Sequence, residues 1–349
     1  MADTLPHVTP AAAPQPVGVA WPTARWPEGE PIGALDALLE AAFTDPELEE
    51  TYAVVVVQHG RLVAERYGGA LPSFTHPPTE VTASTPLLSW SMAKSVLHAA
   101  VGCLVDDGRL DPDAPAAVPE WSDPSDPRGR ITLRELLQMR DGLAWVEDYV
   151  DDGISDVIEM LFGTGAADVG AFAAGHPLAA APGTRFNYSS GTSNLVARLV
   201  GDVVGRGEPT RAFLRDRLFG PLGMDDAAVT LDASGTFIGS SYVYCSARSF
   251  AKFATLYLRG GRWEDRQLLS RSWVDGAQVA VSQDADARTY YSHHWWLDGE
   301  GTYWASGYEG QRCVVSPGHD AVVVRLGRTP DERYPAVRAW CDAVVAALA

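Results

Sequence analysis

Long apolar runs and basic residues are what this sequence has least of. No stretch of 18 or more apolar residues occurs, so no segment is predicted to span a membrane. The 27 Lys and Arg residues are outnumbered by 45 Asp and Glu, and the net charge of −18 argues against nucleic acids and anionic membranes as partners. However, 46% of the 349 residues are hydrophobic, which is enough for a large core and excludes a disordered or fibrous protein.

Cysteine is also rare, and no two cysteines form a C-x-x-C pair. We therefore expect reduced, mostly buried thiols in a cytoplasmic protein. Residues 1–32 contain seven prolines and no continuous apolar stretch, so this segment is predicted to be an extended arm on the surface and not a signal peptide. The four cysteines are Cys103, Cys245, Cys313 and Cys341.

Several familiar catalytic and cofactor patterns are missing. There is no Gly-x-Ser-x-Gly of an α/β-hydrolase, no His-Glu-x-x-His, and no glycine-rich pattern for phosphates or dinucleotides. The eight histidines, including the pair His293 and His294, show no helical metal spacing. The sequence therefore predicts neither a metal site nor a cofactor.

What is present begins with two β-hairpins near the two ends of the chain. The first spans residues 52–67 around His59-Gly60, and the second spans 313–324; both have β-branched runs on each side of a turn. The alanine-rich segment 335–348 has the apolar spacing of a helix that packs on a sheet.

The middle of the chain, residues 86–290, has a helical pattern with long loops rich in Gly, Pro and Asp. We predict an α+β fold: an antiparallel sheet flanked by helices and built from both termini, with a mostly helical domain inserted. The predicted parts are an arm (1–32), a sheet domain (33–85 plus 291–349) and a helical domain (86–290), with the active site between the two domains. The clearest predicted helices are 91–106, 131–139, 192–204, 210–218 and 247–259.

Lysine is nearly absent, since 25 of the 27 basic residues are arginine. The two exceptions are Lys94 and Lys252. Arginine keeps its proton near neutral pH, whereas lysine can lose it. A lysine retained in such a chain therefore suggests chemistry that requires an amine to give up its proton.

Lys94 is the only formally charged residue between Val81 and Val105. This helical segment is apolar around its whole circumference, so we expect it to be buried, with a lowered lysine pKa. Ser91 lies three residues before Lys94 on the same helical face, where a neutral amine could take its hydroxyl proton. Ser91 is thus the predicted nucleophile and Lys94 its base, with the Ser91 N–H as an oxyanion donor. The alternative is a structural lysine held by a carboxylate distant in sequence.

A second Ser-x-x-Lys match runs from Ser249 to Lys252. The apolar face of the helix that contains it is formed by Phe250, Phe253 and Tyr257. Because Lys252 lies on the opposite face of that helix, we predict a solvated surface lysine there and no catalytic role.

Two further segments complete a predicted catalytic set. Tyr188 lies in a loop before a helix, where side chains project into clefts. A loop tyrosine by itself is more often a packing residue, but beside Ser91 and Lys94 it could relay a proton to the leaving group. In the segment 304–312, glycines allow a substrate to approach an edge strand closely, and the Gln311 N–H is predicted as the second oxyanion donor.

Together these segments resemble the class C β-lactamase-like serine hydrolases. That superfamily includes β-lactamases, D-alanyl-D-alanine peptidases, family VIII carboxylesterases and 6-aminohexanoate-dimer hydrolases, so the resemblance implies a β-lactamase/transpeptidase-like fold. It covers about residues 50–345. The segments that carry it are Ser91-Met92-Ala93-Lys94, Tyr188-Ser189-Ser190 and Gly307-Tyr308-Glu309-Gly310-Gln311.

The resemblance also implies substrate-binding residues. Trp145 to Tyr149 is similar to the 6-aminohexanoate-dimer hydrolase branch, which implies that Tyr149 contacts the substrate amide. Of the tryptophans beside the motifs (Trp90, Trp145 and Trp304), we expect one or two to form a wall of the pocket. The full set of implied substrate-binding residues is Tyr149, Ser190, Trp90, Tyr308, Glu309 and Gly310.

Two departures from the β-lactamase pattern bear on the substrate. Ser190 stands where β-lactamases and peptidases of this group have asparagine, and Tyr308-Glu309-Gly310 stands where they have Lys-Thr-Gly. We therefore expect no cation to hold a β-lactam carboxylate, and Glu309 to repel it.

The sequence thus predicts a serine hydrolase that cleaves small-molecule esters or amides through an acyl-enzyme, acting as a monomer or homodimer. The alternatives are a β-lactamase or D-amino-acid peptidase, and a catalytically silent binding protein on the same scaffold.

Overall fold

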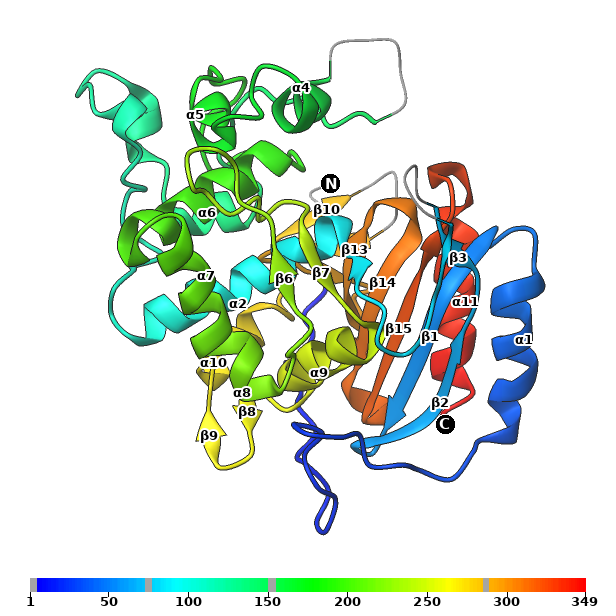
Figure 1. Cartoon of the computed structure of the whole chain (residues 1–349). Coiled ribbons are helices and arrows are strands. Elements are labelled where there is room, and N and C mark those ends of the chain that lie inside the picture. Colours follow the sequence, from blue (N-terminus) through cyan, green and yellow to red (C-terminus); the bar gives the residue numbers. More distant parts are fainter. Residues whose placement is uncertain (1–4, 73–76, 150–154, 285–288) are drawn as a thin grey trace.

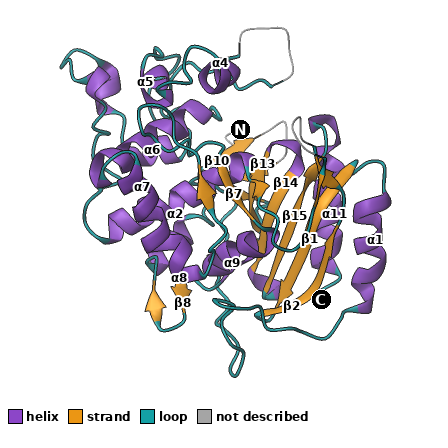
Figure 2. Ribbon diagram, in the orientation of Figure 1, coloured by secondary structure: helices purple, strands orange, loops and turns teal. Residues whose placement is uncertain are grey.

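A computed structural model describes residues 5–72, 77–149, 155–284 and 289–349. Its centre is an eight-stranded antiparallel sheet (Figures 1 and 2). In chain order the strands are β1 (Glu50–Gln58), β2 (Arg61–Tyr67), β10 (Ser282–Asp284), β11 (Thr289–Tyr291), β12 (Trp296–Leu297), β13 (Tyr303–Gly307), β14 (Gln311–Ser316) and β15 (Ala321–Arg328). In space they are ordered β10-β11-β12-β13-β14-β15-β1-β2, so the pairing of β1 with β15 joins the two ends of the chain.

Both predicted hairpins are confirmed. β1 and β2 are joined at His59-Gly60, where both residues have positive φ angles (50° and 71°). β14 and β15 pair with Ser316 opposite Ala321. The antiparallel sheet with flanking helices is therefore the predicted fold class, whereas the predicted domain boundaries stay a prediction.

The valine run of β1 explains how the sheet is covered on both faces. Val55 and Val57 belong to the core shared with the helical part of the chain, whereas Val54 and Val56 belong to a second core with Val337. All four valines are fully buried. Successive side chains of a strand point to opposite faces, so a continuous apolar run indicates a strand that is buried on both faces.

Two helices cover the outer face of the sheet, at the right of Figure 1, and the others lie on the opposite side (Figure 1). The outer pair is α1 (Asp36–Thr44) and α11 (Tyr334–Ala346), of which α11 matches the helix predicted at 335–348. The others are α2 (Ala93–Asp106), α3 (Leu133–Leu137), α4 (Asp156–Phe162), α5 (Val169–Ala174), α6 (Ser190–Val204), α7 (Glu208–Leu214), α8 (Gly220–Leu222), α9 (Ala247–Leu258) and α10 (Arg271–Gly276).

Short strands form three small sheets beside the large one. β5 and β6 both pair with β7, β3 pairs with β4, and β8 pairs with β9. Their bounds are β3 (Ala70–Leu71), β4 (Thr79–Glu80), β5 (Leu87–Leu88), β6 (Ala228–Val229), β7 (Val243–Cys245), β8 (Arg262–Trp263) and β9 (Arg266–Gln267).

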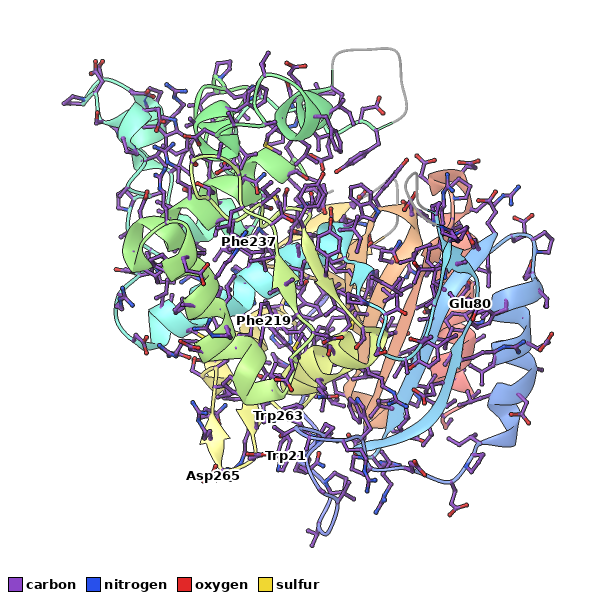
Figure 3. All side chains as sticks on the ribbon, viewed as in Figure 1. Trp21, Glu80, Phe219, Phe237, Trp263 and Asp265 are labelled. Atoms are coloured by element: carbon purple, nitrogen blue, oxygen red, sulfur yellow. The ribbon has the colours of Figure 1, made fainter. Side chains whose placement is uncertain are left out.

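The described part of the N-terminal arm, residues 5–32, runs along the protein and is tied to it. The Ala13 N–H donates to the Leu258 carbonyl at 3.0 Å. The rings of Trp21 and Trp263, which lie together at the lower edge of Figure 3, are 5.1 Å apart. Trp26 is buried, with only 5% of its surface exposed. The arm therefore covers residues that would otherwise face solvent.

The cysteines and the helices bear on two further predictions. All four cysteines are unpaired and buried, as predicted; the cytoplasmic location stays a prediction. Within the described ranges, none of the helices combines the length and the apolar character that crossing a membrane requires.

Candidate active site

A cavity of about 930 Å³ lies where the start of α2, the loop before α6, strand β13 and helix α11 meet. Four predicted site residues line it, namely Ser91, Tyr149, Tyr188 and Tyr308. The other predicted site residues are not part of its wall in the described structure: Trp90, Lys94, Ser190, Glu309, Gly310 and Gln311.

The backbone just before Ser91 has an uncommon conformation. Trp90 has a φ angle of +44° in the 3-10 turn Trp90–Met92 that leads into α2. Bulky residues rarely adopt positive φ, so neighbouring contacts must hold the turn. The Trp90 indole N–H donates to Glu309 Oε2 at 3.0 Å, and its ring packs edge-on against Tyr308 at 5.5 Å. Trp90 and Glu309 therefore support Ser91 from behind the cavity wall.

Lys94 lies directly beneath Ser91 and is 99% buried. Its Nζ is 2.9 Å from Ser91 Oγ and donates to Ser190 Oγ and to the Ser240 carbonyl, both at 3.1 Å. Burial lowers the pKa of Lys94 to about 8, although the charge of Glu147 raises it. The predicted pair of Ser91 and Lys94 is therefore in hydrogen-bond contact, with an amine that loses its proton more easily than usual.

Glu147 reaches Lys94 only through the hydroxyl of Ser190. The Ser190 hydroxyl donates to Glu147 Oε1 at 2.6 Å, and the Ser190 N–H donates to Oε2 at 2.8 Å. Trp145 Nε1 and the Tyr149 hydroxyl also donate to this carboxylate, at 2.6 and 3.0 Å. Among the described residues, no carboxylate forms an ion pair with Lys94. Lys94 is therefore not a structural lysine held by a carboxylate distant in sequence, which was the alternative.

Glu147 was not among the predicted site residues, and Ser190 was predicted to contact the substrate. Ser190 is fully buried, so its contact is with Lys94 and not with the cavity. A signal for Glu147 exists in the sequence. Trp145, Glu147 and Tyr149 alternate along an irregular segment, and residues two apart can face the same side of an extended chain.

Tyr188 lies against Lys94 in the cavity wall. Its ring centre is 4.8 Å from Lys94 Nζ, and its ring packs against that of Trp296 at 5.5 Å. Burial and the charge of Glu147 raise the pKa of Tyr188 well above its ordinary value, while a hydrogen bond with Ser91 lowers it. The phenol therefore keeps its proton at neutral pH, and its role as a proton relay stays a prediction.

Strand β13 approaches the start of α2 very closely at Gly307. A Cβ atom on Gly307 would lie 2.3 Å from the Ser89 carbonyl oxygen, so only glycine fits this contact. Tyr308 follows at the start of the 3-10 turn Tyr308–Gly310. The first N–H groups of a helical turn have no partner within that turn. Tyr308 lines the same cavity as Ser91.

Gln311, predicted as the second oxyanion donor, is not at the cavity wall. It is 97% buried, begins β14 and is paired with Gly307 in the hairpin. Its side chain donates to the Gly327 carbonyl at 2.6 Å and accepts from the Gly327 N–H at 3.0 Å. The 3-10 turn of residues 308–310 lies between the two strands, so Gln311 is already the first residue of β14.

A cation is present in the cavity wall, although the segment Tyr308-Glu309-Gly310 contains none. Arg312, at the start of β14, lines the cavity. The carboxylate of Glu309, expected to repel an anionic substrate, instead accepts from Trp90 and lies 3.5 Å from Arg328 Nε. Gly310 is buried and does not line the cavity; a Cβ atom on it would lie 2.9 Å from Arg325 Nη1. Strand pairing, and not spacing along the sequence, brings an arginine to this wall.

Aromatic side chains form much of the wall. Tyr149 stacks on Tyr308 with ring centres 4.7 Å apart. Trp304 and Trp296 line the cavity, whereas Trp90 and Trp145 do not. Of the three tryptophans considered in the sequence, one is therefore in the wall, which agrees with the expectation of one or two.

The prediction that Lys252 is solvated is wrong. Only 8% of its surface is exposed, and its Nζ donates to the carbonyls of Thr23 and Gly223. Burial lowers its pKa, while the nearby aspartates raise it. The N-terminal arm, which contains Thr23, covers the face of α9 that helical spacing had marked as exposed.

Comparisons with known proteins agree with this geometry. Residues 41–347 match the Beta-lactamase family. The chain is 29% identical to a 6-aminohexanoate-dimer hydrolase from Paenarthrobacter ureafaciens, an alignment that covers 89% of this chain and 81% of the relative.

Two solved structures show the same fold. A 6-aminohexanoate-dimer hydrolase candidate from Bacillus anthracis has a TM-score of 0.76 at 20% identity, covering 97% of this chain and 90% of its own. A family VIII carboxylesterase has a TM-score of 0.68 at 15% identity, covering 90% and 99%. The likeness to both structures extends over nearly the whole chain.

Proposed function

Because this chain belongs to the Beta-lactamase family, we propose that it is a serine hydrolase that cleaves ester or amide bonds through an acyl-enzyme. In this mechanism Ser91 is the nucleophile, Lys94 the general base and Tyr188 the proton relay. The observation that carries the proposal is the 2.9 Å contact between Lys94 Nζ and Ser91 Oγ in a buried setting that opens on a cavity.

The other contacts of Lys94 orient its lone pair. Glu147 accepts the Ser190 hydroxyl proton, so Ser190 Oγ can only accept from Lys94. The Ser240 carbonyl is also an acceptor. A neutral amine has two N–H groups and one lone pair. With both N–H groups donated to these oxygens, the lone pair faces the hydroxyl of Ser91.

This arrangement makes Glu147 a positioning residue. Without its carboxylate, the Ser190 hydroxyl could turn and donate to the lone pair of Lys94, in competition with Ser91. Three further donors, from Trp145, Tyr149 and the Ser190 N–H, hold the carboxylate in place. Glu147 therefore acts on the reaction through Ser190 and does not need to touch the substrate.

The proposed reaction proceeds in two steps. Ser91 Oγ attacks the carbonyl carbon while its proton passes to Lys94, and the N–H groups of Ser91 and Tyr308 stabilise the oxyanion. Tyr188 passes a proton to the leaving alcohol or amine and regains one from Lys94. Water then attacks the acyl carbonyl carbon and gives a proton to Lys94. When the bond between the acyl carbon and Ser91 Oγ breaks, Lys94 passes this proton to Oγ, and the acid is released.

The first experiment is a panel of p-nitrophenyl esters, linear amides and β-lactams, tested with the wild type and Ser91→Ala. We expect turnover by the wild type and a mass increase equal to the acyl group on Ser91 by intact-protein mass spectrometry. Ser91→Ala that retained the wild-type rate would contradict the proposal. Failure of a fluorophosphonate to label the folded wild type would favour a silent binding protein.

A second candidate is the hydrolysis of β-lactams or of peptides that end in a D-amino acid. The presence of Arg312 in the cavity favours it, since both substrates carry a carboxylate. Rapid nitrocefin turnover, or a stable penicillin adduct on Ser91, would support this candidate over the ester and amide hydrolase.

A further inference from the structure

Arg312 lines the cavity but has no acidic partner. The residue is 92% buried, and its guanidinium lies over the Tyr334 ring at 5.3 Å. Within the described residues, no Asp or Glu forms an ion pair with it. Buried charges in proteins are normally paired, because removing an unpaired charge from water is costly.

The hydrogen bonds of Arg312 leave one edge of its guanidinium free. Nη1 donates to Ser306 Oγ at 2.6 Å and to the Gln311 carbonyl at 2.9 Å. Arginine has five N–H groups, so these two bonds leave three, on Nε and Nη2, with no acceptor in the described part of the chain. Neither nitrogen is among the fully buried side-chain atoms that lack a hydrogen-bond partner, and Arg312 lines the cavity.

Arg325 increases the need for an anion at this position. It lies directly opposite Arg312 on β15 and is fully buried. Its hydrogen bonds run to backbone carbonyls and to the hydroxyls of Thr51 and Thr329, and no carboxylate pairs with it in the described residues. Two adjacent guanidinium groups of like charge repel each other, which a bound anion beside Arg312 would relieve.

Four acids line the cavity, and three of them have partners other than Arg312. The fourth, Asp148, forms no ion pair with Arg312 within the described residues. Glu147 accepts four hydrogen bonds, and Asp342 lies 3.9 Å from Arg338 Nε. Asp331 accepts from the N–H of Glu332 at 3.0 Å. None of the three neutralises Arg312.

Arg312 is also close to the reacting groups. Ser306, to which it is bonded, is followed in β13 by Gly307 and then by Tyr308, whose N–H is the proposed oxyanion donor. The charge of Arg312 is one of the weaker effects that lower the pKa of Tyr188, beneath the larger effect of burial, which raises it. A ligand that spans Ser91 and Arg312 therefore fits within one cavity of about 930 Å³.

We propose that the substrate carries a carboxylate, and that Arg312 binds it side-on through Nε and Nη2. The two parallel N–H groups of this edge match the two oxygens of a carboxylate. Ser306 and the ring of Tyr334 hold the guanidinium in place. This inference rests on the proposed hydrolase function and narrows its substrates to anionic esters or amides.

Matched substrates test the inference on both sides of the scissile bond. On the acyl side, mono-p-nitrophenyl adipate is compared with p-nitrophenyl hexanoate. On the leaving-group side, 4-carboxyphenyl hexanoate is compared with its methyl ester. We expect the wild type to prefer the carboxylate form of at least one pair, and Arg312→Gln to lower kcat/KM for that form roughly 10- to 100-fold, mainly through KM.

Control variants separate charge from folding. Arg312→Lys keeps the charge but loses the two-pronged edge, so we expect an intermediate preference. Arg271→Gln removes a half-exposed arginine outside the cavity wall, and we expect no change in preference. A thermal unfolding midpoint of Arg312→Gln close to that of the wild type would show that this variant folds.

Failure of the inference and failure of the proposed function give different results. Equal kcat/KM for both members of both pairs, with hydrolysis that requires Ser91, would overturn the inference alone. A preference that Arg312→Gln retained would also overturn it. If no ester is hydrolysed, the proposed function fails. Calorimetric titration of Ser91→Ala with adipate then tests the anion site by itself. Binding that is lost in Ser91→Ala/Arg312→Gln supports the anion site, whereas no binding overturns it.

Discussion

The same four-residue pattern occurs twice in this chain and has two different environments. Ser91 and Lys94 stand at the start of α2, and Ser249 and Lys252 stand at the start of α9. Both lysines are buried, and burial lowers the pKa of both. A serine hydroxyl also donates to a carboxylate near each lysine. Ser190 donates to Glu147 near Lys94, and Ser249 donates to Asp226 near Lys252.

What differs is the contact between amine and alcohol. Lys94 Nζ is 2.9 Å from Ser91 Oγ, and Ser91 lines a cavity. Lys252 donates to two backbone carbonyls, and the Ser249 hydroxyl donates to Asp226 instead. Spacing and burial are therefore not sufficient for a catalytic pair; the serine must also face the amine and an open space.

The largest expected effect separates the two serines. Ser91→Ala and Lys94→Arg should each lower kcat by about 10³-fold or more, since one removes the nucleophile and the other an amine that can be deprotonated. Steady-state kinetics on a p-nitrophenyl ester measure this. Ser249→Ala should leave kcat within about twofold, because no catalytic step involves it. Equal losses in both serine variants would remove the distinction.

The second effect is the pH dependence of the wild type. Lys94 acts as a base, and burial lowers its pKa to about 8. The rate should therefore rise with pH and reach half its plateau near pH 8. At pH 6 roughly 1% of the amine is neutral, so kcat/KM should be about 100-fold below the plateau. A profile that was flat from pH 6 to 9 would contradict Lys94 as the base.

The third prediction compares the carboxylates of Glu147 and Asp226. Glu147→Gln should lower kcat by about tenfold, because the Ser190 hydroxyl can then turn toward Lys94. It should also shift the rising limb of the pH profile to lower pH, since the charge of Glu147 raises the pKa of Lys94. Asp226→Asn should change neither kcat nor the position of the rising limb. A loss of kcat in Glu147→Gln without a shift of the limb would indicate a merely structural role.

The smallest kinetic effect belongs to Lys252. Lys252→Met leaves the carbonyls of Thr23 and Gly223 without a donor, so we expect a loss of about 1–3 kcal/mol in the free energy of unfolding. We expect kcat to stay unchanged. Chemical denaturation and steady-state kinetics measure the two quantities, and a stable variant with reduced kcat would contradict the structural role of Lys252.

Much of the fold was predictable because its signals are local. The β-branched runs on either side of His59-Gly60 are adjacent in the sequence and form a hairpin, and the buried segment around Lys94 forms a helix. The predicted helix at 131–139 is only Leu133–Leu137, and α4 and α5 were not predicted. These helices have only five to seven residues, too few to show a clear period.

Spacing along the sequence predicts a contact in the site only where the partners are close in sequence. Tyr149, Tyr188 and Tyr308, which also line the cavity, were predicted from their motifs and the family resemblance. Ser91 and Lys94 are one helical turn apart, so their contact follows from spacing. Glu147 and Arg312 reach the site through a loop and through strand pairing, which spacing does not reveal. The arm over Lys252 is equally non-local, because Thr23 is 229 positions away.

The contact of Gly307 with the Ser89 carbonyl has a consequence for how this gene can vary. Every single-base change of a glycine codon that alters the residue introduces a Cβ, and here that atom would sit 2.3 Å from a carbonyl oxygen. The edge strand would have to retreat from the segment that carries Ser91. We therefore expect selection to eliminate missense alleles at position 307, even where the encoded protein accumulates to normal levels.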